Sequence, residues 1–380
     1  MPNLFGLPDI TFANKDAAEI KRDIITKFET AFFDATGERL TLYPSDPRRL
    51  FLSTIADVIV LQRNLIDYVT KQNMLAFANG EPLEHLGLYM SVTRLPAQRA
   101  GVTIRFTLSA PQPGTMIIPA GTRVTPSGGN IYFSTDGNLE IPAGEMTGDV
   151  HATAMETGEQ SNGFIAGQIN RLVDPLPYIQ NVTNTTTSEG GADIEDDENL
   201  RERTRLAPEG FSNAGSTGAY IFWARGASQL IADIGVYSPK PGVVNIFPLL
   251  ADGEIPGQEI LDAVLAACNA DTVRPLTDLV QVLPPRKVKF NLNVTWHLER
   301  SSATKVIDIT SKVNFAVQNW LVWQRSKLGR DINPSELISQ MVQAGAKRVV
   351  VESPDFRVLE FDEVAVAASE SVTYGGIEDG

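Results

Sequence analysis

The sequence predicts a multidomain α+β protein, with a helical N-terminal region, a small β-rich middle domain and a C-terminal α/β region of one or two subdomains. Three observations lead to this prediction. At 380 residues the chain is too long for one ordinary hydrophobic core. Apolar residues recur at helical spacing up to about residue 95 and then alternate strictly, and beyond residue 190 helical and strand patterns follow one another. The expected segments are 1–95, 96–190, 191–284 and 285–380, with the last boundary at Pro284-Pro285.

The N-terminal region reads as helices separated by turns. Its first helix is predicted from one apolar stripe, formed by Ile20, Ile24, Phe28 and Phe32. Ser45 or Asp46 can cap a second helix, because Pro47 then falls in the first turn, where its missing N–H costs little. We expect this helix to run to about Phe77 and to stop at Asn79-Gly80. A third helical segment follows over residues 82–90.

The second helix carries a possible intersubunit seam. At roughly 30 residues it is long for a globular domain. Six of its residues follow alternating spacings of four and three, which is the pattern of a coiled-coil seam: Phe51, Ile55, Val58, Gln62, Leu65 and Val69. Two interpretations stay open. The helix either packs within its own domain or enters a bundle with other chains.

The middle region predicts a compact β domain. In "GVTIRFTLS" one face of a strand is apolar, at Val102, Ile104, Phe106 and Leu108. A weak internal repeat follows, "IPAGTRVT" from Ile118 and "IPAGEMTGDV" from Ile141. In each copy a proline stops one strand and a glycine permits the turn into the next.

The C-terminal region alternates between helical and strand patterns. We expect a short helix in "STGAYIFWARGA", a hairpin around "PKPG" and a helix in "GQEILDAVLAACNA". "KVKFNLNVTW" is the clearest strand, and a long helix from Val306 and a capped helix at Asn333-Pro334 follow it. "KRVVVES" and "FRVLEF" are predicted as closing strands, and the end "YGGIEDG" is predicted to fray.

The acidic stretch "EGGADIEDDENLRER" has to be assigned to chemistry or to structure. A calcium loop counted from Asp193 needs glycine at the sixth position and glutamate at the twelfth. Those positions hold Glu198 and Thr204, which disfavours a metal site. A helix start fits better, because Asp196 or Asp197 can accept hydrogen bonds from the free N–H groups of a first turn.

The predicted acidic helix is a short, charged helix on the surface. Asp197 with Arg201 and Glu202 with Arg205 have the spacing of helical ion pairs, and Pro208 ends the helix. Gly190-Gly191, directly before it, is the candidate hinge between the β domain and the C-terminal part.

Composition excludes several classes of function. The net charge of −14 disfavours binding to nucleic acid or to an anionic membrane surface. A single cysteine, Cys268, lies in an apolar run and predicts an inert buried thiol, with no internal disulfide and no multi-cysteine metal site. No window is long and apolar enough for a membrane span, and no signal sequence is evident, so we expect synthesis in a cytoplasm without membrane insertion.

No catalytic motif is evident. The phosphate-binding loop, the dinucleotide fingerprint and the zinc motif H-E-x-x-H are missing from the sequence, and "GFSNAG" around Ser212 is not a nucleophile elbow. The three histidines, His85, His151 and His297, lack ligand spacing and are expected to be structural. A carboxylate pair for glycoside cleavage depends only on spatial separation and stays open. We therefore expect no cofactor, no metal and no enzyme activity.

Several stretches in combination resemble the baseplate J family. They are "GGADIEDDENLRERTRLAPEGFSNAGSTGAY", followed by "IADIGVYSPKPGVVNIFPLL". "IPAGTRVT", "TGEQSNGFIAGQINRL" and "VTNTTTSEGGAD" resemble the middle region of that family in the same order, and "NGEPLEHLGLYMSVTRLPAQRA" resembles its N-terminal region. The resemblance is good over residues 45–300 and looser elsewhere, and the acidic segment is often shorter in the family.

The resemblance implies a structural wedge component of the baseplate in a contractile tail, as in phages, phage-tail-like bacteriocins and related injection systems. It implies that two copies join another wedge protein through a helical bundle, and that the C-terminal region links neighbouring wedges into a ring around the central hub and spike, near the sheath initiator. It also implies that the ring rearranges on host contact and releases sheath contraction, with assembly in the bacterial host cytoplasm. The alternative is a tail-associated hydrolase of cell wall or polysaccharide.

Overall fold

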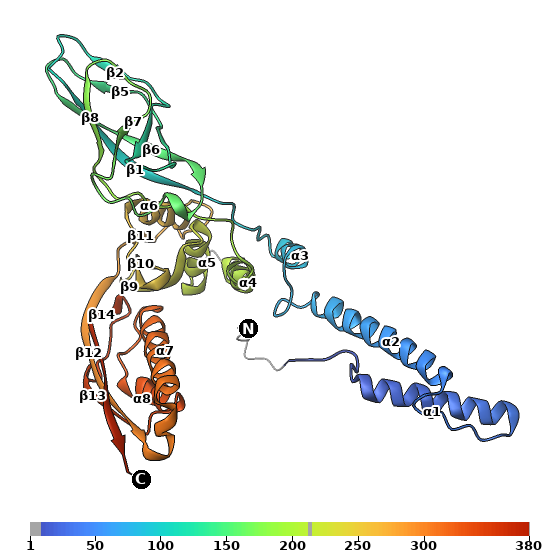
Figure 1. Ribbon diagram of the computed structural model, residues 1–380. Coiled ribbons are helices and arrows are strands. Elements are labelled where there is room, and N and C mark those ends of the chain that lie inside the picture. The colour runs from blue at the N-terminus through green and yellow to red at the C-terminus, as the bar shows by residue number, and fades with distance from the viewer. Residues whose placement is uncertain (1–8, 212–214, 380) are drawn as a thin grey trace. The chain divides into compact units, whose positions relative to one another are not determined.

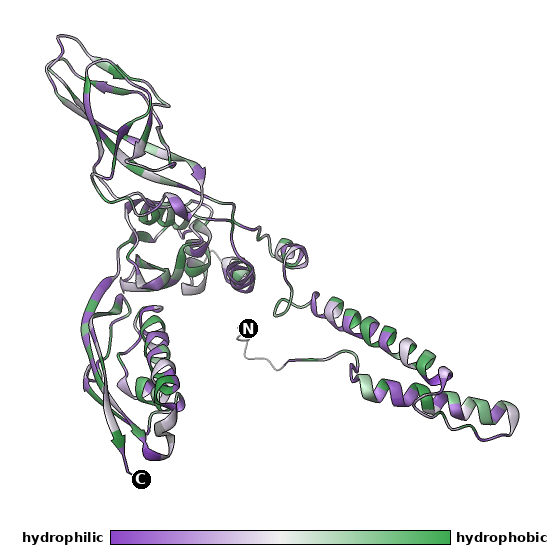
Figure 2. Ribbon diagram, viewed as in Figure 1, coloured by the Kyte–Doolittle hydropathy of each residue, from purple (hydrophilic) through white to green (hydrophobic). Residues whose placement is uncertain are grey.

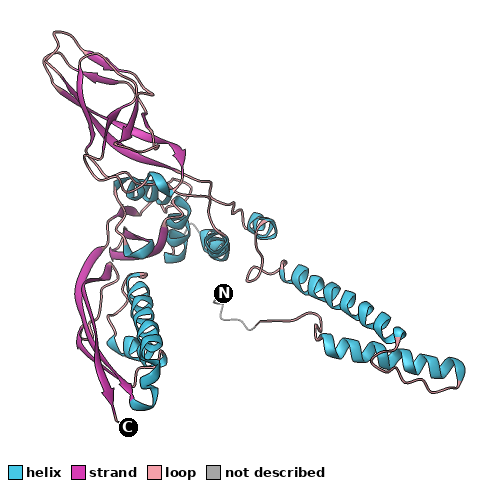
Figure 3. Ribbon diagram, viewed as in Figure 1, coloured by secondary structure: helices cyan, strands magenta, loops and turns pink. Residues whose placement is uncertain are grey.

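The computed structural model describes residues 9–211 and 215–379, and the chain divides into two compact units (Figure 1). The first unit comprises the chain up to Thr93 together with Asp197–Arg205, and the second comprises Arg94–Asp196 and the chain from Leu206 onward. The acidic helix therefore belongs with the N-terminal helices rather than with the domains on either side of it in the sequence. Helices, strands and loops of both units are distinguished in Figure 3.

The first unit consists of α1 (Ala17–Thr36), α2 (Pro47–Lys71), α3 (Glu81–Tyr89) and most of α4 (Asp197–Leu206). The Asp46 side chain accepts the Arg48 N–H at 2.9 Å, so the predicted cap of α2 is confirmed. The predicted end of α2 is wrong. The helix ends at Lys71 after 25 residues, and the chain then continues through hydrogen-bonded turns to Ala78.

The β domain is a six-stranded sheet in the order β7-β3-β4-β6-β1-β8. Its end strands, β7 and β8, contact each other, so the sheet curves almost to closure. The predicted inward face of β1, with Val102, Ile104, Phe106 and Leu108, is confirmed as buried. The strands are β1 (Arg99–Leu108), β2 (Met116–Ile118), β3 (Arg123–Pro126), β4 (Phe133–Thr135), β5 (Leu139–Ile141), β6 (Thr147–Thr157), β7 (Ile169–Leu172) and β8 (Ile179–Asn184).

The internal repeat forms a two-stranded sheet of its own. β2 and β5 pair antiparallel, with Ile118 opposite Leu139 and Met116 opposite Ile141. After each strand the chain turns at a glycine with positive φ, 82° at Gly121 and 87° at Gly144. The prediction of a proline stop followed by a glycine turn is therefore confirmed in both copies.

The central α/β part packs two helices against a three-stranded sheet in the order β11-β10-β9. Its elements are α5 (Thr217–Ala227), β9 (Ile231–Lys240), β10 (Val243–Leu250), α6 (Gln258–Cys268) and β11 (Leu279–Val282). The predicted hairpin joins β9 to β10 and turns at Gly242, with φ 78°. Cys268 is fully buried, and burial raises the pKa of its thiol to about 12, which fits the predicted inert role.

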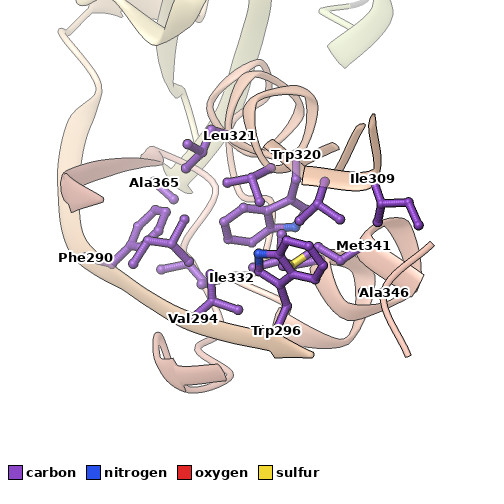
Figure 4. Close-up of a cluster of buried hydrophobic side chains, with 14 of the residues drawn as sticks. Phe290, Val294, Trp296, Ile309, Trp320, Leu321, Ile332, Met341, Ala346 and Ala365 are labelled. Atoms are coloured by element: carbon purple, nitrogen blue, oxygen red, sulfur yellow. The ribbon is translucent and has the colours of Figure 1, made fainter. Parts of the chain in front are cut away.

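The C-terminal part is a three-stranded sheet covered by two helices. The sheet order is β13-β12-β14, and the elements are β12 (Arg286–Glu299), α7 (Val306–Arg325), α8 (Pro334–Gln343), β13 (Arg348–Ser353) and β14 (Glu363–Glu378). The core between the layers is shown in Figure 4, where Trp296 and Trp320 lie at its centre. The Phe290 and Trp320 rings meet edge to face, with centroids 5.9 Å apart.

Two predictions for the end of the chain are wrong. "FRVLEF" is not a strand, and within it Arg357 forms only an isolated bridge with Ile332. The predicted frayed end is instead the last part of β14, which pairs in parallel with β12 as far as Glu378. Backbone pairing with a strand some 80 residues earlier orders the tail, and no local pattern reports that pairing. Gly380 lies outside the described residues.

Four short 3₁₀ segments complete the described part of the chain, at Glu159–Ser161, Ala207–Phe211, Ala251–Gly253 and Arg300–Lys305. Among the helices of residues 9–211 and 215–379, none has the length and apolar character to cross a bilayer.

Candidate assembly surfaces

One face of α2 packs on α1, and the predicted seam lies on another. Leu52 and Ala56 are buried on the α1 side. Because each residue advances about 100° around a helix, the seam lies roughly 120° from these two residues. All six seam residues are exposed: Phe51, Ile55, Val58, Gln62, Leu65 and Val69. The exposed fraction of the five apolar ones runs from 37% at Ile55 to 66% at Phe51.

A second exposed apolar row runs beside the seam. Leu50, Leu61 and Tyr68 are more than half exposed and lie about 80–100° further around α2. Hydrophobic residues accordingly recur along the whole length of α2 (Figure 2). Sequence reasoning missed this row because Thr54, Asp57 and Asn64 interrupt it, although the spacing of four and three is the same. Together the two rows are wider than one coiled-coil seam and can contact more than one partner helix.

A shallow groove opens where α1 and α2 meet. Its volume is about 290 Å³, and it is lined by Phe28, Pro47, Arg48, Phe51 and Leu52. Phe51 thus belongs both to this groove and to the seam.

The extended segment before α1 is held on α2 by ion pairs and hydrogen bonds. Asp67, buried on α2, accepts the Phe12 N–H at 2.8 Å and the Lys15 ammonium at 2.6 Å. Lys71 adds a second cation 3.6 Å from the same carboxylate. The Lys15 hydrogen bond, followed by the Phe12 N–H, holds the pKa of Asp67 below its usual value. Asp67 is therefore an ionised anchor for the segment.

The acidic helix α4 anchors the turns that follow α2. Arg201 donates from Nε to the Leu75 carbonyl at 2.9 Å, and from its terminal nitrogen to the Ala78 carbonyl at 2.7 Å and to Asn79 Oδ1 at 3.1 Å. Glu198, one turn earlier, pairs with the same guanidinium at 2.6 Å. The turns after α2 leave carbonyl groups without helical partners, and this arginine satisfies two of them.

The prediction of a surface-lying acidic helix is wrong. Leu200, Arg201, Arg203 and Thr204 are buried, and Arg203 donates to the Thr93 carbonyl at 3.2 Å. The predicted helix start is confirmed, since α4 begins at Asp197. The predicted pair of Glu202 with Arg205 is also confirmed, at 2.6 Å. On one face of α4 the charged side chains are buried and bind backbone carbonyl groups, and on the other face they form an ion pair at the surface.

One acidic residue before α4, Glu195, holds backbone groups. The Glu195 carboxylate is buried and accepts the Leu95 N–H at 2.9 Å, while the Glu195 N–H donates to the Leu95 carbonyl at 3.1 Å. Within the described ranges, no group of three histidine, cysteine, aspartate or glutamate side chains has an arrangement that could hold a metal ion.

The candidate hinge lies between two antiparallel bridges. Glu189 pairs with Gly101 on one side, and Ala192 pairs with Gln98 on the other. Gly190 has φ 86°, which favours glycine. The Gly191 N–H donates to Asn162 Oδ1 at 2.8 Å, and the Asn162 amide donates to the Gly191 carbonyl at 2.7 Å. A pivot at this point has to break these contacts.

Two of the histidines occupy the structural positions predicted for them. His85 is exposed on α3, and His297 is partly buried on β12, 3.6 Å from Glu378. His151 is different, because it contacts two carboxylates. Ser212, which sequence reasoning rejected as a nucleophile, lies outside the described residues.

Comparisons with known proteins match these domains one by one. The Baseplate J-like protein barrel domain matches residues 103–191, the Baseplate J-like central domain matches residues 212–284, and the Baseplate J-like protein C-terminal domain matches residues 291–375. Together the three matches extend over well more than half of the chain.

Among curated proteins, Baseplate protein J of Escherichia phage P2 is 30% identical over 189 residues. The match covers 49% of this chain and 61% of the phage P2 protein. Among solved structures, a chain of the cryo-EM structure of the anti-feeding prophage baseplate, 6-fold symmetrised, covers 92% of this chain and 90% of its own length. Its TM-score is 0.42 at 12% identity, a likeness too low to support an argument about this chain.

Proposed function

This chain belongs to the baseplate J-like protein family, and from that premise we propose that it is a structural wedge component of a contractile-tail baseplate. The proposed location is the baseplate of a phage or phage-tail-like particle that assembles in the bacterial host cytoplasm. In this proposal the protein is not an enzyme. Its role is to form the ring around the central hub and to transmit the trigger for sheath contraction.

The observation that carries the proposal is the exposed apolar face of α2. Five large apolar side chains at heptad spacing stay exposed although α1 is already packed on the same helix. Burial of apolar area of this kind favours association, and the entropy that the partners lose on binding offsets part of the gain. The proposed partners on this face are a second copy of the chain and another wedge protein. The sheath initiator and the hub or spike proteins are the proposed partners elsewhere in the ring.

Gln62 gives the proposed bundle a register. It stands in the middle of the seam, between Val58 and Leu65, where a coiled coil otherwise has apolar residues. A polar residue at one core position lowers stability but favours the alignment in which it meets another polar group. The seam residues therefore support a specific bundle rather than unspecific apolar association.

Exchange of two seam residues for aspartate tests the proposal. In the double variant Ile55→Asp, Val58→Asp, co-expressed with the other tail proteins, we expect no baseplates by electron microscopy and no higher oligomers in size-exclusion chromatography. Both side chains are exposed in the single chain, so its circular dichroism should stay unchanged. Intact particles from this variant would contradict the proposal.

The matched control adds the same charge to the same helix away from the seam. Ser53 and Asn64 lie roughly 140–160° around α2 from the seam, and the variant Ser53→Asp, Asn64→Asp should assemble normally. If both variants fail to assemble, charge on α2 rather than the seam explains the result. The alternative function, a polysaccharide hydrolase, predicts a cleared zone in a zymogram of the purified chain, and we expect none.

For the trigger we propose that Gly190-Gly191 acts as a pivot during baseplate rearrangement. The support is its place at the end of the β domain, directly before the segment that leads into α4. Particles that are assembled from a variant with proline in place of both glycines should fail to contract. Unchanged contraction of that variant would remove the pivot from the mechanism.

A further inference from the structure

His151 lies between two carboxylates that come from different parts of the second unit. On β6, its Nδ1 is 2.5 Å from Asp136 Oδ2, in the turn after β4, and its Nε2 is 2.7 Å from Glu259 Oε1, in the first turn of α6. Asp136 also accepts the Thr153 hydroxyl at 2.9 Å. Both ring nitrogens therefore face an acceptor. Only the doubly protonated imidazolium can donate to both.

Two glycines make room for the carboxylates at this contact. A Cβ atom on Gly101 of β1 would lie 2.0 Å from Glu259 Oε1, so the carboxylate rests directly on the glycine. A Cβ atom on Gly257 would likewise lie 1.8 Å from the Glu189 carboxylate. Each part of the unit thus places a carboxylate on a glycine of the other.

Glu189 also caps α6. The residue at the start of that helix is Gly257, which has no side chain for capping. The Glu189 carboxylate accepts backbone hydrogen bonds from Gly257 and Glu259, two of the free N–H groups of the first turn. The end of the β domain therefore holds the start of α6 through Glu189, and β6 holds it through His151.

The charges around His151 are mostly negative. Asp136 and Glu259 contact the ring, and Glu189 lies beside Glu259. Arg99 lines the same pocket as Glu259, of about 420 Å³, while Arg105, further along β1, is paired with Asp149 at 2.7 Å. A proton on His151 offsets part of this negative charge. Loss of that proton leaves a ring lone pair facing a carboxylate.

Proton binding to this cluster and closure of the contact are coupled. Burial lowers the pKa of His151, but the hydrogen bonds to Glu259 and Asp136 outweigh it and leave the pKa above its ordinary 6.5. A raised pKa in the folded state stabilises the contact fully below pH 6.5, and the stabilisation is lost as the pH rises through the raised value. Burial and repulsion from Glu259 also raise the pKa of Glu189. This raised pKa likewise makes the contact less stable as the pH rises.

We propose that His151, with Asp136, Glu259 and Glu189, forms a proton-controlled latch between the β domain and helix α6. The latch is closed while the imidazole is cationic and loosens when it loses its proton. Its residue Glu189 lies directly before Gly190-Gly191. The inference concerns the single chain and holds or fails independently of the proposed assembly.

Nuclear magnetic resonance of the full chain tests the contact. The protein has three histidines, so selective labelling of the imidazole ring gives three signals, which single His→Gln variants assign. We expect the His151 signal to titrate above pH 6.5 and to move down in Glu259→Gln and in Gly101→Ala. The second variant changes no charge, because its methyl group only displaces the Glu259 carboxylate. A His151 titration that is the same in all three proteins would overturn the proposal.

Hydrogen exchange between pH 6 and pH 9, corrected for the intrinsic rate, tests whether the contact works as a latch. Exchange at the first turn of α6 should accelerate in the wild type as His151 deprotonates. In His151→Gln it should be fast and free of this transition. His85→Gln, an exposed histidine of the other unit, is the matched control and should behave as wild type. Equal protection of α6 in wild type and His151→Gln across the range would refute the latch even if the contact exists.

Discussion

The guanidinium of Arg201 donates a 2.7 Å hydrogen bond to the carbonyl oxygen of Ala78, 123 residues earlier in the chain. This contact gives a structural role to Arg201, one of the arginines that follow the acidic residues. An arginine has five donors in a fixed planar arrangement, which suits several carbonyl groups of one turn. The turns between α2 and α3 are thereby held by a helix that follows the β domain in the sequence.

Removal of Arg201 should loosen these turns. Arg201→Ala leaves the half-buried carbonyl of Leu75 and the buried carbonyl of Ala78 without their donor, so we expect a loss of about 3 kcal/mol in local stability. Hydrogen exchange of residues 72–79 measures it. Arg205→Ala is the control, because its exposed pair with Glu202 contributes only about 0.3 kcal/mol. Equal effects of the two variants would contradict the anchoring role.

The segment before α1 should detach from α2 at acid pH. The pKa of Asp67 is lowered by its hydrogen bond with Lys15, so its contribution is present above pH 3.8 and is lost as the pH falls through the lowered value. The amide resonance of Phe12, whose N–H donates to Asp67, reports the change.

In Asp67→Asn the acid transition of Phe12 should vanish, because the amide keeps an acceptor but has no charge to lose. Asp57→Asn is the matched control. Asp57 is an exposed aspartate of the same helix, and its replacement should leave the transition in place. A Phe12 resonance that ignores the Asp67 substitution would show that the segment is held in another way.

A methyl group at Gly191 should destabilise the β domain. The Cβ atom of Gly191→Ala would lie 2.5 Å from the Gly158 carbonyl oxygen and 2.9 Å from Asn162 Oδ1. Backbone cannot yield as a flexible side chain does, so we expect a cost of about 2 kcal/mol in urea unfolding. At Gly137 an added Cβ meets nothing within 4 Å, and Gly137→Ala should change stability by less than about 0.5 kcal/mol. If both variants unfold alike, the close approach at Gly191 is not a constraint on the domain.

Local patterns predicted much of the fold. The cap at Asp46, the alternation from Val102 to Leu108 and the two proline–glycine turns depend on neighbouring residues, and the structure contains all of them. They are readable because helix capping, strand alternation and turn formation are properties of short segments.

Long-range contacts were not predictable in the same way. Arg201 looks like a surface residue, because its partners are carbonyl groups more than 120 residues away, which carry no sequence signal. The role of His151 depends on acids 15 and 108 residues distant. The seam of α2 could be predicted from its residue spacing, but a spacing of four and three does not indicate which chain packs on it.

The last strand provides a test of the same kind of long-range order. Amides near the end of β14 should exchange slowly, because Ile377 and Glu378 are paired with Leu298 and Glu299 of β12. Arg348 on β13 holds Glu378 from across the sheet, with Nε 3.0 Å from its carboxylate. In Arg348→Ala we expect faster exchange at Ile377 and Glu378 only, since backbone pairing further back in β14 is untouched.

Residues 110–115, a largely exposed loop between β1 and β2, are the internal reference for fast exchange in the same experiment. Mass spectrometry of peptides from the two segments gives both rates from one sample. If the last residues of β14 exchanged as fast as this reference, the tail would be frayed as its glycines and polar residues first indicate. Slow exchange would show that pairing with β12 outweighs the flexibility of Gly375 and Gly376.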